Sequence, residues 1–231
     1  MPNFSGIWTV TQQMQAVGQS LWPSPPLAIG DAYGGGFYAG QISTAGNSIA
    51  DYNLVVGPLS SGESTLQWKN ANTTTPGADS NINGPQNTAD MVADGNATVY
   101  PCAHFCNDAV IGGFTDWYMP AKNELEVCYF NLKPLTNANN TSSGINANAV
   151  PARASNYTGG TPATNPAQTT SASFQSGGAQ AFDASTYWCS TETAGYAGAY
   201  ARTQAFGGGF QGYATFKNAY NRVRAIRRVA V

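Results

Sequence analysis

The segment from Gly112 to Leu125 constrains the fold of this chain more than any other stretch. It reads Gly-Gly-Phe-Thr-Asp-Trp-Tyr-Met-Pro-Ala-Lys-Asn-Glu-Leu. The glycine pair 112–113 is typical of a helix C-cap, and the aromatic run 114–118 predicts a short strand or an extended turn. Pro120 fits the first turn of a second helix, where its missing N–H leaves no bond unmade. Helix, turn, strand and helix therefore follow one another closely here.

Apolar spacing predicts the two helices that flank this segment. Residues 99–110 carry apolar side chains at helical spacing and form the first helix. In the second helix, apolar residues recur at i, i+3, i+4 and i+7, and Pro134 ends it. Residues 70–97 are polar and predict a loop with a short helix near 87–93. The buried face of the second helix consists of Leu125, Cys128, Tyr129 and Leu132.

Strand-like runs lie towards both ends of the chain, with the helices between them. Each run is bounded by Gly, Asn, Asp or Pro, as strands commonly are. The triglycine 207–209 joins two of the runs into a β-hairpin. This order predicts an α+β fold with twisted antiparallel sheets, two helices and long loops, and not a parallel βαβ array. The runs span residues 36–42, 52–56, 66–68, 186–191, 199–206, 210–217 and 222–229.

Two segments depart from this regular pattern. Residues 1–26 are predicted to form an N-terminal arm with a Pro-rich linker, and residues 27–231 to form one domain. Trp8 and Trp22 of the arm either dock onto another subunit or pack on the domain. Residues 134–180 are predicted to be a long polar loop insertion, which lies along the domain or across a neighbouring subunit. Its candidate anchors are Ile145, Val150, Tyr157 and Phe174.

The composition excludes several classes of partner. Only 10% of residues are charged, against about 25% in an average soluble protein, and the net charge is −2. Neither nucleic acid nor an anionic membrane is therefore an expected partner. No apolar run approaches the roughly 18 residues of a membrane span, and residues 1–6 lack the pattern of a secretory signal. If the protein works outside a cell, we expect it to leave by a route other than a secretory signal, such as release within a virus particle.

Catalytic patterns are absent from the sequence, so we expect no enzyme activity, no cofactor and no metal. His104 is the sole histidine and is predicted to lie on a buried helix face, so a catalytic triad would be short of an available base. Glu124 and Glu126 are two apart on a predicted helix and point to different sides, unlike paired glycosidase carboxylates. Neither 34–36 nor 207–209 has the context of a phosphate loop, and no calcium-loop pattern occurs. For Glu124 we favour a structural role, accepting bonds from backbone N–H groups or an arginine.

The four cysteines are interpreted as buried free thiols. Cys102 and Cys106 lie one helical turn apart, but a zinc site needs a second pair of ligands at metal spacing. Cys128 and Cys189 stand alone in the sequence. Because free cysteine behaves as a small core hydrophobe, burial is favoured over a metal site or a disulfide.

Four arginines close to the C-terminus form a basic cluster. In a chain of net charge −2, their expected partners are acidic residues of the same domain, such as Asp116 or Glu192. Nucleic-acid binding by this cluster is therefore disfavoured. The cluster comprises Arg222, Arg224, Arg227 and Arg228.

Several motifs, taken in order, resemble one known family. They are Ile-Gly-Asp at 29–31, Gly-Gly-Phe-Tyr at 35–38, Tyr-Asn-Leu-Val-Val-Gly-Pro at 52–58, Leu-Gln-Trp-Lys at 66–69, the segment 112–125, Tyr-Trp-Cys-Ser-Thr-Glu at 187–192, and Tyr-Asn-Arg-Val-Arg-Ala-Ile-Arg at 220–227. From about Ile29 onward, the series resembles the Lcl C-terminal domain family. The resemblance implies a C-type-lectin-like fold, in a family that includes often trimeric bacterial adhesin tips and phage structural proteins. Residues 5–9 also resemble the start of phage virion proteins that carry this domain.

Some residues depart from the pattern that the resemblance implies. Trp188-Cys189-Ser190 stands where the family usually has Trp-Ser followed by Ser or Thr. Formylglycine-generating oxidases share the broader fold and use two cysteines near the C-terminus, but only Cys189 lies there. The calcium-ligand triplet and the Trp-Asn-Asp motif of calcium-dependent lectins are also absent, so calcium-dependent sugar binding is not supported.

The resemblance extends to the variable proteins of diversity-generating retroelements, which place their diversified residues in the C-terminal strands and loops. Strand alternation predicts that Tyr200, Arg202 and Gln204 share an outward face, above small residues that pack under the sheet. By analogy, the receptor-binding candidates are Tyr196, Tyr200, Arg202, Gln204, Phe210, Gln211, Tyr213, Asn218 and Tyr220.

Three functions follow, in order of preference. The first is a phage tail-fibre or tail-tip adhesin in the virion, a homo-oligomer with a trimer favoured. It binds a host cell-surface glycan or protein receptor through its C-terminal hairpin and loops, and other virion proteins through residues 1–26. The second is a structural virion component, such as a collar, decoration or fibre protein. The third is an oxidase of the formylglycine-generating type.

Overall fold

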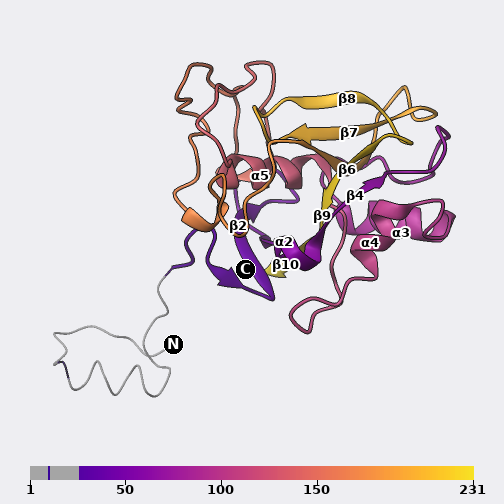
Figure 1. Cartoon of the computed structure of the whole chain (residues 1–231), viewed down its shortest axis with the longest axis horizontal. Coiled ribbons are helices and arrows are strands. Elements are labelled where there is room, and N and C mark those ends of the chain that lie inside the picture. The colour runs from indigo at the N-terminus through magenta and orange to yellow at the C-terminus, as the bar shows by residue number, and fades with distance from the viewer. Residues whose placement is uncertain (1–9, 11–25) are drawn as a thin grey trace.

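The computed structural model describes Val10 and residues 26–231, so the predicted arm, apart from Val10 and Pro26, lies outside the described residues. The described part contains both sheets and helices, which confirms the α+β class (Figure 1). In chain order the elements are β1 (Ala32–Tyr33), β2 (Gly36–Ile42), β3 (Tyr52–Val56), α2 (Leu59–Gly62), β4 (Glu63–Gln67), α3 (Gly84–Asp94), α4 (Pro101–Asn107), α5 (Lys122–Leu132), β5 (Ala149–Val150), the 3-10 turn η1 (Ala172–Phe174), β6 (Thr186–Glu192), β7 (Tyr200–Ala205), β8 (Gln211–Phe216), β9 (Tyr220–Arg224) and β10 (Ile226–Ala230).

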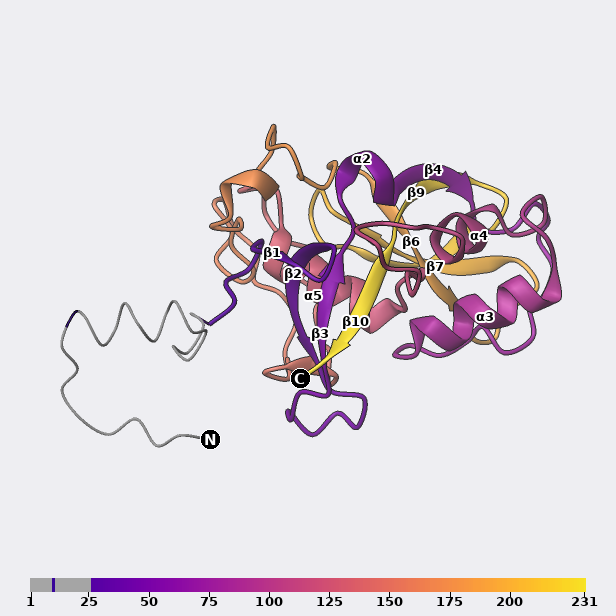
Figure 2. The ribbon, with the colours of Figure 1, turned by 90° about the horizontal axis from the view of Figure 1, so that it is seen from below.

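The strands form two sheets of five strands each. The first has the order β1-β2-β3-β10, with β5 also paired to β2, and the second has the order β4-β9-β6-β7-β8. Figure 2 shows β3 and β10 side by side, although they come from opposite ends of the chain. Every pair is antiparallel except β6 with β9, where Tyr187 lies opposite Arg222 in a parallel register. The predicted antiparallel sheets are therefore correct apart from this one pairing.

Two of the points at which the chain crosses between the sheets, β3 to β4 and β9 to β10, touch each other. The predicted strand 222–229 is wrong as a single element, because Ala225 separates β9 in the second sheet from β10 in the first. Ala225 N donates to Gly62 O at 2.8 Å, and Gly57 N donates to Ala225 O at 2.9 Å. A Cβ on Gly62 would lie 3.0 Å from the Gly57 backbone, so glycine is required where the crossings meet.

The segment from Gly112 to Leu125 differs from its prediction at its glycine pair, and the helix before it ends earlier than predicted. The first helix is α4, which ends at Asn107 with Asp108 as its C-cap, so the glycine pair is not the cap. Gly112 and Gly113, with φ of 62° and 81°, form instead a tight turn that joins Ile111 to Phe114. Residues 114–118 form no strand, and only Phe114 and Tyr118 make isolated bridges, so of the two predicted alternatives the strand is wrong and the extended turn remains. A tight turn and a helix C-cap both place glycine at a left-handed φ, so a glycine pair in the sequence is compatible with either structure.

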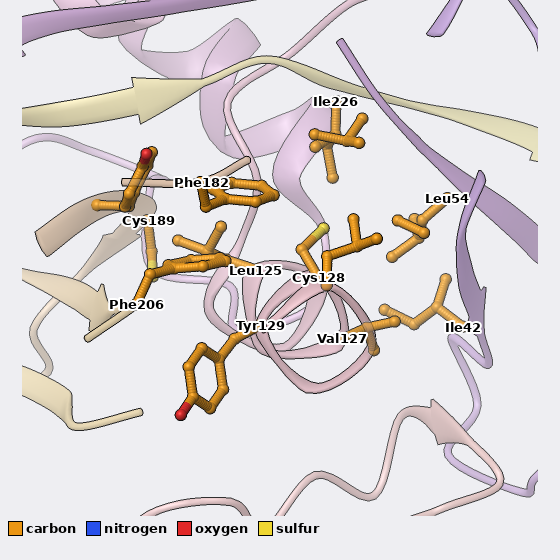
Figure 3. Packing of buried hydrophobic residues seen from close by; sticks show 14 of the residues in the cluster. Ile42, Leu54, Leu125, Val127, Cys128, Tyr129, Phe182, Cys189, Phe206 and Ile226 are labelled. Carbon is orange, nitrogen blue, oxygen red and sulfur yellow. The ribbon is translucent and has the colours of Figure 1, made fainter. Parts of the chain in front are cut away.

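Helix α5 occupies the centre of the larger core. Its four predicted apolar residues, Leu125, Cys128, Tyr129 and Leu132, are all buried, which confirms the predicted face. Figure 3 shows α5 residues between Ile42 and Leu54 of the first sheet and Cys189 of the second. The helix starts at Lys122, after Pro120, with Ala121 as its N-cap. A second core lies around Trp68 and Trp188 and includes residues of α3 and α4.

The polar segment 134–180 lies along the domain and packs on it. Tyr157 and Phe174 are buried, whereas Ile145 is exposed and Val150 belongs to β5, so two of the four predicted anchors are core residues. The buried ammonium of Lys133 holds the segment by donating to Asn137 O at 2.6 Å, Asn139 Oδ1 at 2.7 Å and Pro166 O at 3.4 Å. Hydrogen bonds to the buried Lys133 thus help to hold this segment on the domain, although its sequence has no apolar periodicity.

Candidate functional site

The C-terminal hairpin is built on the second sheet and rests on α5. Strands β7 and β8 pair in an antiparallel register, and the turn 207–209 joins them as predicted. Gly209 has φ of 79°, and a Cβ there would lie 2.6 Å from the Tyr129 ring of α5. Figure 1 shows β8 at the edge of the sheet, beyond β7 and β6. The turn is therefore fixed against the core, and the free edge of the hairpin is β8.

The structure does not bring the nine predicted receptor residues onto one face. Thr203 Oγ1 lies 3.3 Å from Thr215 Oγ1, so these two side chains share one face of the hairpin. The rings of Tyr200 and Phe216 are in contact, with centroids 4.8 Å apart and planes tilted by 51°. They share the other face, because consecutive residues of a strand alternate. Phe216 was not predicted, although it lies in the same strand run as Tyr213 and is 51% exposed.

Gln204 corrects the predicted outward face of β7. Its side chain is fully buried, and Arg202 and Tyr200 are half-buried. Helix α5 contacts β7, so the strand is covered where the alternation predicted solvent. Ala201 and Thr203 on the other face are buried as well. A period of two identifies faces, but only tertiary packing decides whether either face meets water.

The remaining predicted residues are placed as expected or close to it. Gln211 is half-buried, and its Oε1 accepts from Gly144 N of the 134–180 segment at 3.3 Å. The exposed members of the prediction are Tyr196, Phe210, Tyr213, Asn218 and Tyr220. In the described part of the chain, every exposed aromatic side chain except Phe114 lies between residues 196 and 220.

Two adjoining hollows lie on the face of the second sheet that carries Thr203 and Thr215. One encloses about 370 Å³ and is bordered by Phe210 and Tyr213. Its neighbour encloses about 490 Å³ and is bordered by Tyr220. Both are lined by Thr186 and Asn221, so hydroxyl and amide groups form their floor. We call the two together, with their rim of Phe210, Tyr213 and Tyr220, the hairpin hollow.

Unpaired polar atoms concentrate on the same hairpin. Within residues 26–231, the buried side-chain nitrogen and oxygen atoms without a hydrogen-bond partner are Arg202 Nε, both amide atoms of Gln204, and Gln211 Nε2. All of them belong to predicted receptor residues. Buried polar groups in folded proteins are nearly always hydrogen-bonded. The hairpin is therefore the part of residues 26–231 where buried side-chain polar atoms lack hydrogen-bond partners within the chain.

The charged residues of the closing strands are paired within the domain. Arg227 makes a two-bond pair with Asp116, at 2.7 and 2.8 Å, which confirms one predicted partner. Glu192 instead pairs with the buried Lys217, so the prediction of an arginine partner for Glu192 is wrong. The other arginine pairs are Arg222 with Glu63 and Asp183, Arg224 with Glu63, and Arg228 with Glu124.

Glu124 has the structural role that the sequence predicted. Its carboxylate is fully buried and accepts from Ala121 N at 2.8 Å, Gly84 N at 3.1 Å and Arg228 Nε at 2.8 Å. The Tyr118 hydroxyl donates to it as well, at 2.5 Å. Burial raises the pKa of this carboxyl, and the positive charge of Arg228 acts in the opposite direction. The carboxylate of Glu124 thus fastens the segment 112–125 to α3 and β10.

The four cysteines are free and buried, as predicted. Burial raises the pKa of Cys189 to about 12, so its thiol is protonated at neutral pH. Nucleophilic cysteine chemistry uses the thiolate, and this environment disfavours it. Among residues 26–231, no three His, Cys, Asp or Glu side chains are grouped to hold a metal ion. The described part also contains no helix long and apolar enough to cross a bilayer.

Comparison with protein-family models, with curated proteins and with solved structures gives no match to this chain. The assignment to an α+β class rests on the two sheets and their helices, and the C-type-lectin-like arrangement stays a prediction from the sequence motifs.

Proposed function

We propose that this protein is a phage tail-fibre or tail-tip adhesin, with a C-type-lectin-like fold, that binds a host cell-surface receptor through the hairpin hollow. The observation that carries the proposal is the concentration of exposed aromatic side chains between residues 196 and 220. Exposed tyrosines give a large contact area at little cost in side-chain entropy, as they do in antibody loops.

The chemistry of the hollow indicates how the receptor is held. Its rim is aromatic, its floor is hydroxyl and amide, and the one arginine at its border, Arg222, is already paired with Glu63 and Asp183. Recognition therefore depends on stacking and neutral hydrogen bonds rather than on net charge. Because ionic strength screens charge pairs far more than apolar contacts, we expect binding to change little between low and physiological salt.

The test uses a double variant of the rim. Tyr213 and Tyr220 are 58% and 67% exposed, so changing both to alanine removes contact area without opening the core. Fluorescently labelled protein on host bacterial cells is expected to lose at least about tenfold in affinity, in line with interface tyrosines that act as hot spots. The control changes Ile49 and Val110, which are 67% and 71% exposed elsewhere, to alanine.

The control variant should bind host cells like the unaltered protein, and both variants should keep its melting temperature. If the tyrosine variant binds host cells unchanged, the hairpin hollow is not the receptor site. Binding that is lost equally in the control variant would contradict the assignment as well.

A structural virion component is the second candidate, and the position of β8 favours it. This strand is the edge of its sheet, with Tyr213, Ala214 and Phe216 exposed. Edge strands with apolar side chains are surfaces on which another chain can pair. Cryo-electron microscopy of the particle separates the two candidates. A distal hairpin open to solvent supports the adhesin, and a hairpin covered by a neighbouring virion protein supports the structural component.

A further inference from the structure

A cleft of about 690 Å³ lies between elements that take no part in the hairpin. It is formed by the start of α3, the last residue of α4, the segment 115–118, and β3 and β10. This volume falls within the range of roughly 300–1,000 Å³ that small-molecule sites occupy. Its walls combine aromatic side chains with short polar ones, and carry one carboxylate and one guanidinium.

The carboxylate in the cleft is held in place and remains accessible. Asp116 is 54% exposed, and both of its oxygens are oriented by Arg227. Its bonds to Arg227 hold the pKa of Asp116 below its ordinary value, so it is ionised at neutral pH. The bonds to Arg227 occupy one side of the carboxylate, and a carboxylate has about four acceptor positions. Asp116 is therefore an oriented acceptor for further donors.

The guanidinium in the cleft carries no free charge for a ligand. Arg228 donates to the buried carboxylate of Glu124 at 2.8 Å and also to Ile82 O. Its side chain is only 12% exposed and lies over the Tyr52 ring, 5.1 Å from the centroid. Because Glu124 neutralises Arg228, an anionic ligand would meet the Asp116 carboxylate without an unpaired cation to balance it. The cleft thus disfavours anions.

The neutral groups of the cleft complete a pattern of donors and apolar surface. Asn83 Oδ1 caps α3 by accepting from Gln86 N at 3.3 Å, and no described residue accepts from the Asn83 amide nitrogen. Asn107 and Thr115 are exposed at the border. Tyr52, with Ile82 and Pro85, supplies apolar surface beside them. A ligand that fits has several hydroxyl groups, a carbonyl or ring oxygen, and one apolar face.

We propose that this cleft binds a neutral saccharide of one or two sugar rings. Two sugar hydroxyls donate to Asp116, a sugar oxygen accepts from the Asn83 amide, and the C–H face of a ring packs against Tyr52. The cleft shares no lining residue with the hairpin hollow, so this inference does not depend on the proposed receptor site.

The test measures saturation-transfer NMR with the whole chain and a panel of free sugars at up to 20 mM. The panel contains glucose, galactose, mannose, N-acetylglucosamine, lactose and maltose, with glucuronic acid as the anionic probe. At least one neutral sugar is expected to bind, and glucuronic acid is expected to bind more weakly than glucose. Affinities in the millimolar range suffice for this measurement.

Two variants assign the signal to the cleft. Thr115→Tyr places a large side chain at the exposed border and should abolish the transfer, and Asp116→Asn should weaken binding about tenfold by removing a charged acceptor. Thr98→Tyr, at an exposed threonine that does not line the cleft, is the matched control and should bind like the unaltered protein. Circular dichroism verifies that each variant is folded.

The proposal is overturned if no neutral sugar of the panel binds at 20 mM, or if Thr115→Tyr leaves binding unchanged. It is also overturned if glucuronic acid binds more tightly than every neutral sugar. A signal that is lost in the Tyr213 and Tyr220 double variant but kept in Thr115→Tyr would place the sugar in the hairpin hollow instead.

Discussion

The cleft and the hairpin hollow present two different kinds of surface on one domain. In the cleft, the polar groups are fixed by ion pairs that reach into the core, with Asp116 held by Arg227 and Arg228 held by Glu124. In the hairpin hollow, exposed aromatic rings surround a floor of neutral polar groups. Buried side-chain atoms of Arg202, Gln204 and Gln211 in β7 and β8 have no hydrogen-bond partner. The difference indicates that the closing strand β10 serves the framework, whereas the exposed side chains of β8, Tyr213 and Phe216, are free to vary without weakening it.

The largest expected effect is on the cleft side, from Glu124→Gln. The change leaves Arg228 without its buried counter-charge and replaces one of the two accepting oxygens with an NH2 donor. The NH2 group then faces either the donors Ala121 N and Gly84 N or the donors Tyr118 and Arg228. We expect the free energy of unfolding to fall by about 3 kcal/mol, as when one partner of a buried ion pair is removed. Urea denaturation measures it. Asp108→Asn, at a 63% exposed carboxylate, is the control and should change stability by less than about 0.5 kcal/mol. Equal losses in the two variants would contradict the framework role.

An intermediate effect is expected on the hairpin side, from Gln204→Met. Both amide atoms of Gln204 are buried and unpaired, so an apolar chain of similar length should raise the free energy of unfolding by about 1 kcal/mol. The matched control is Asn87→Leu. The Asn87 amide is equally buried but bonded to Ser80 and Ser190, so its loss should cost about 2 kcal/mol. If Gln204→Met lowers the free energy of unfolding as much as Asn87→Leu does, the buried amide of Gln204 is hydrogen-bonded as fully as that of Asn87.

The smallest expected effect is the pH dependence of the Asp116–Arg227 pair. Arg227 lowers the pKa of Asp116 in the folded state, so the pair stabilises the protein above the unfolded pKa of about 3.9 and loses this contribution as the pH falls through the folded value. Because Asp116 is half exposed, the contribution is well below about 1 kcal/mol.

Stability of the unaltered protein should therefore decline more steeply below pH 4 than that of Asp116→Asn. In an Arg227→Gln background, the further change Asp116→Asn should no longer alter this decline, which closes a double-mutant cycle. A steeper decline in Asp116→Asn than in the unaltered protein would reverse the sign and refute the assignment.

Much of the fold follows from local sequence patterns. The runs 36–42 and 52–56 are β2 and β3 at their predicted bounds, and the apolar spacing of Leu125 to Leu132 identified the buried face of α5. The triglycine 207–209 predicted the hairpin turn. Each of these features depends on neighbours within a few residues, so its signal is contained in the local sequence.

The candidate site was predicted only in part. The exposed tyrosines of the hairpin were identified, but Gln204 was placed on the surface and Phe216 was omitted. Alternation assigned Tyr200 and Gln204 to one face correctly, yet it carried no information about α5, which covers that face. The cleft was not anticipated at all, because its walls come from segments separated by most of the chain.

The sequence by itself determined the α+β class, the hairpin turn at 207–209, the buried face of α5 and the low content of charged residues. Those properties depend on period, turn chemistry and composition. Tertiary structure decided which strand faces meet solvent, that Ala225 divides the closing run between two sheets, and that Arg227 and Arg228 orient groups around a cleft. The physical reason is that exposure and ion pairing depend on which distant segments pack together, and long-range packing leaves no periodic signal in the chain.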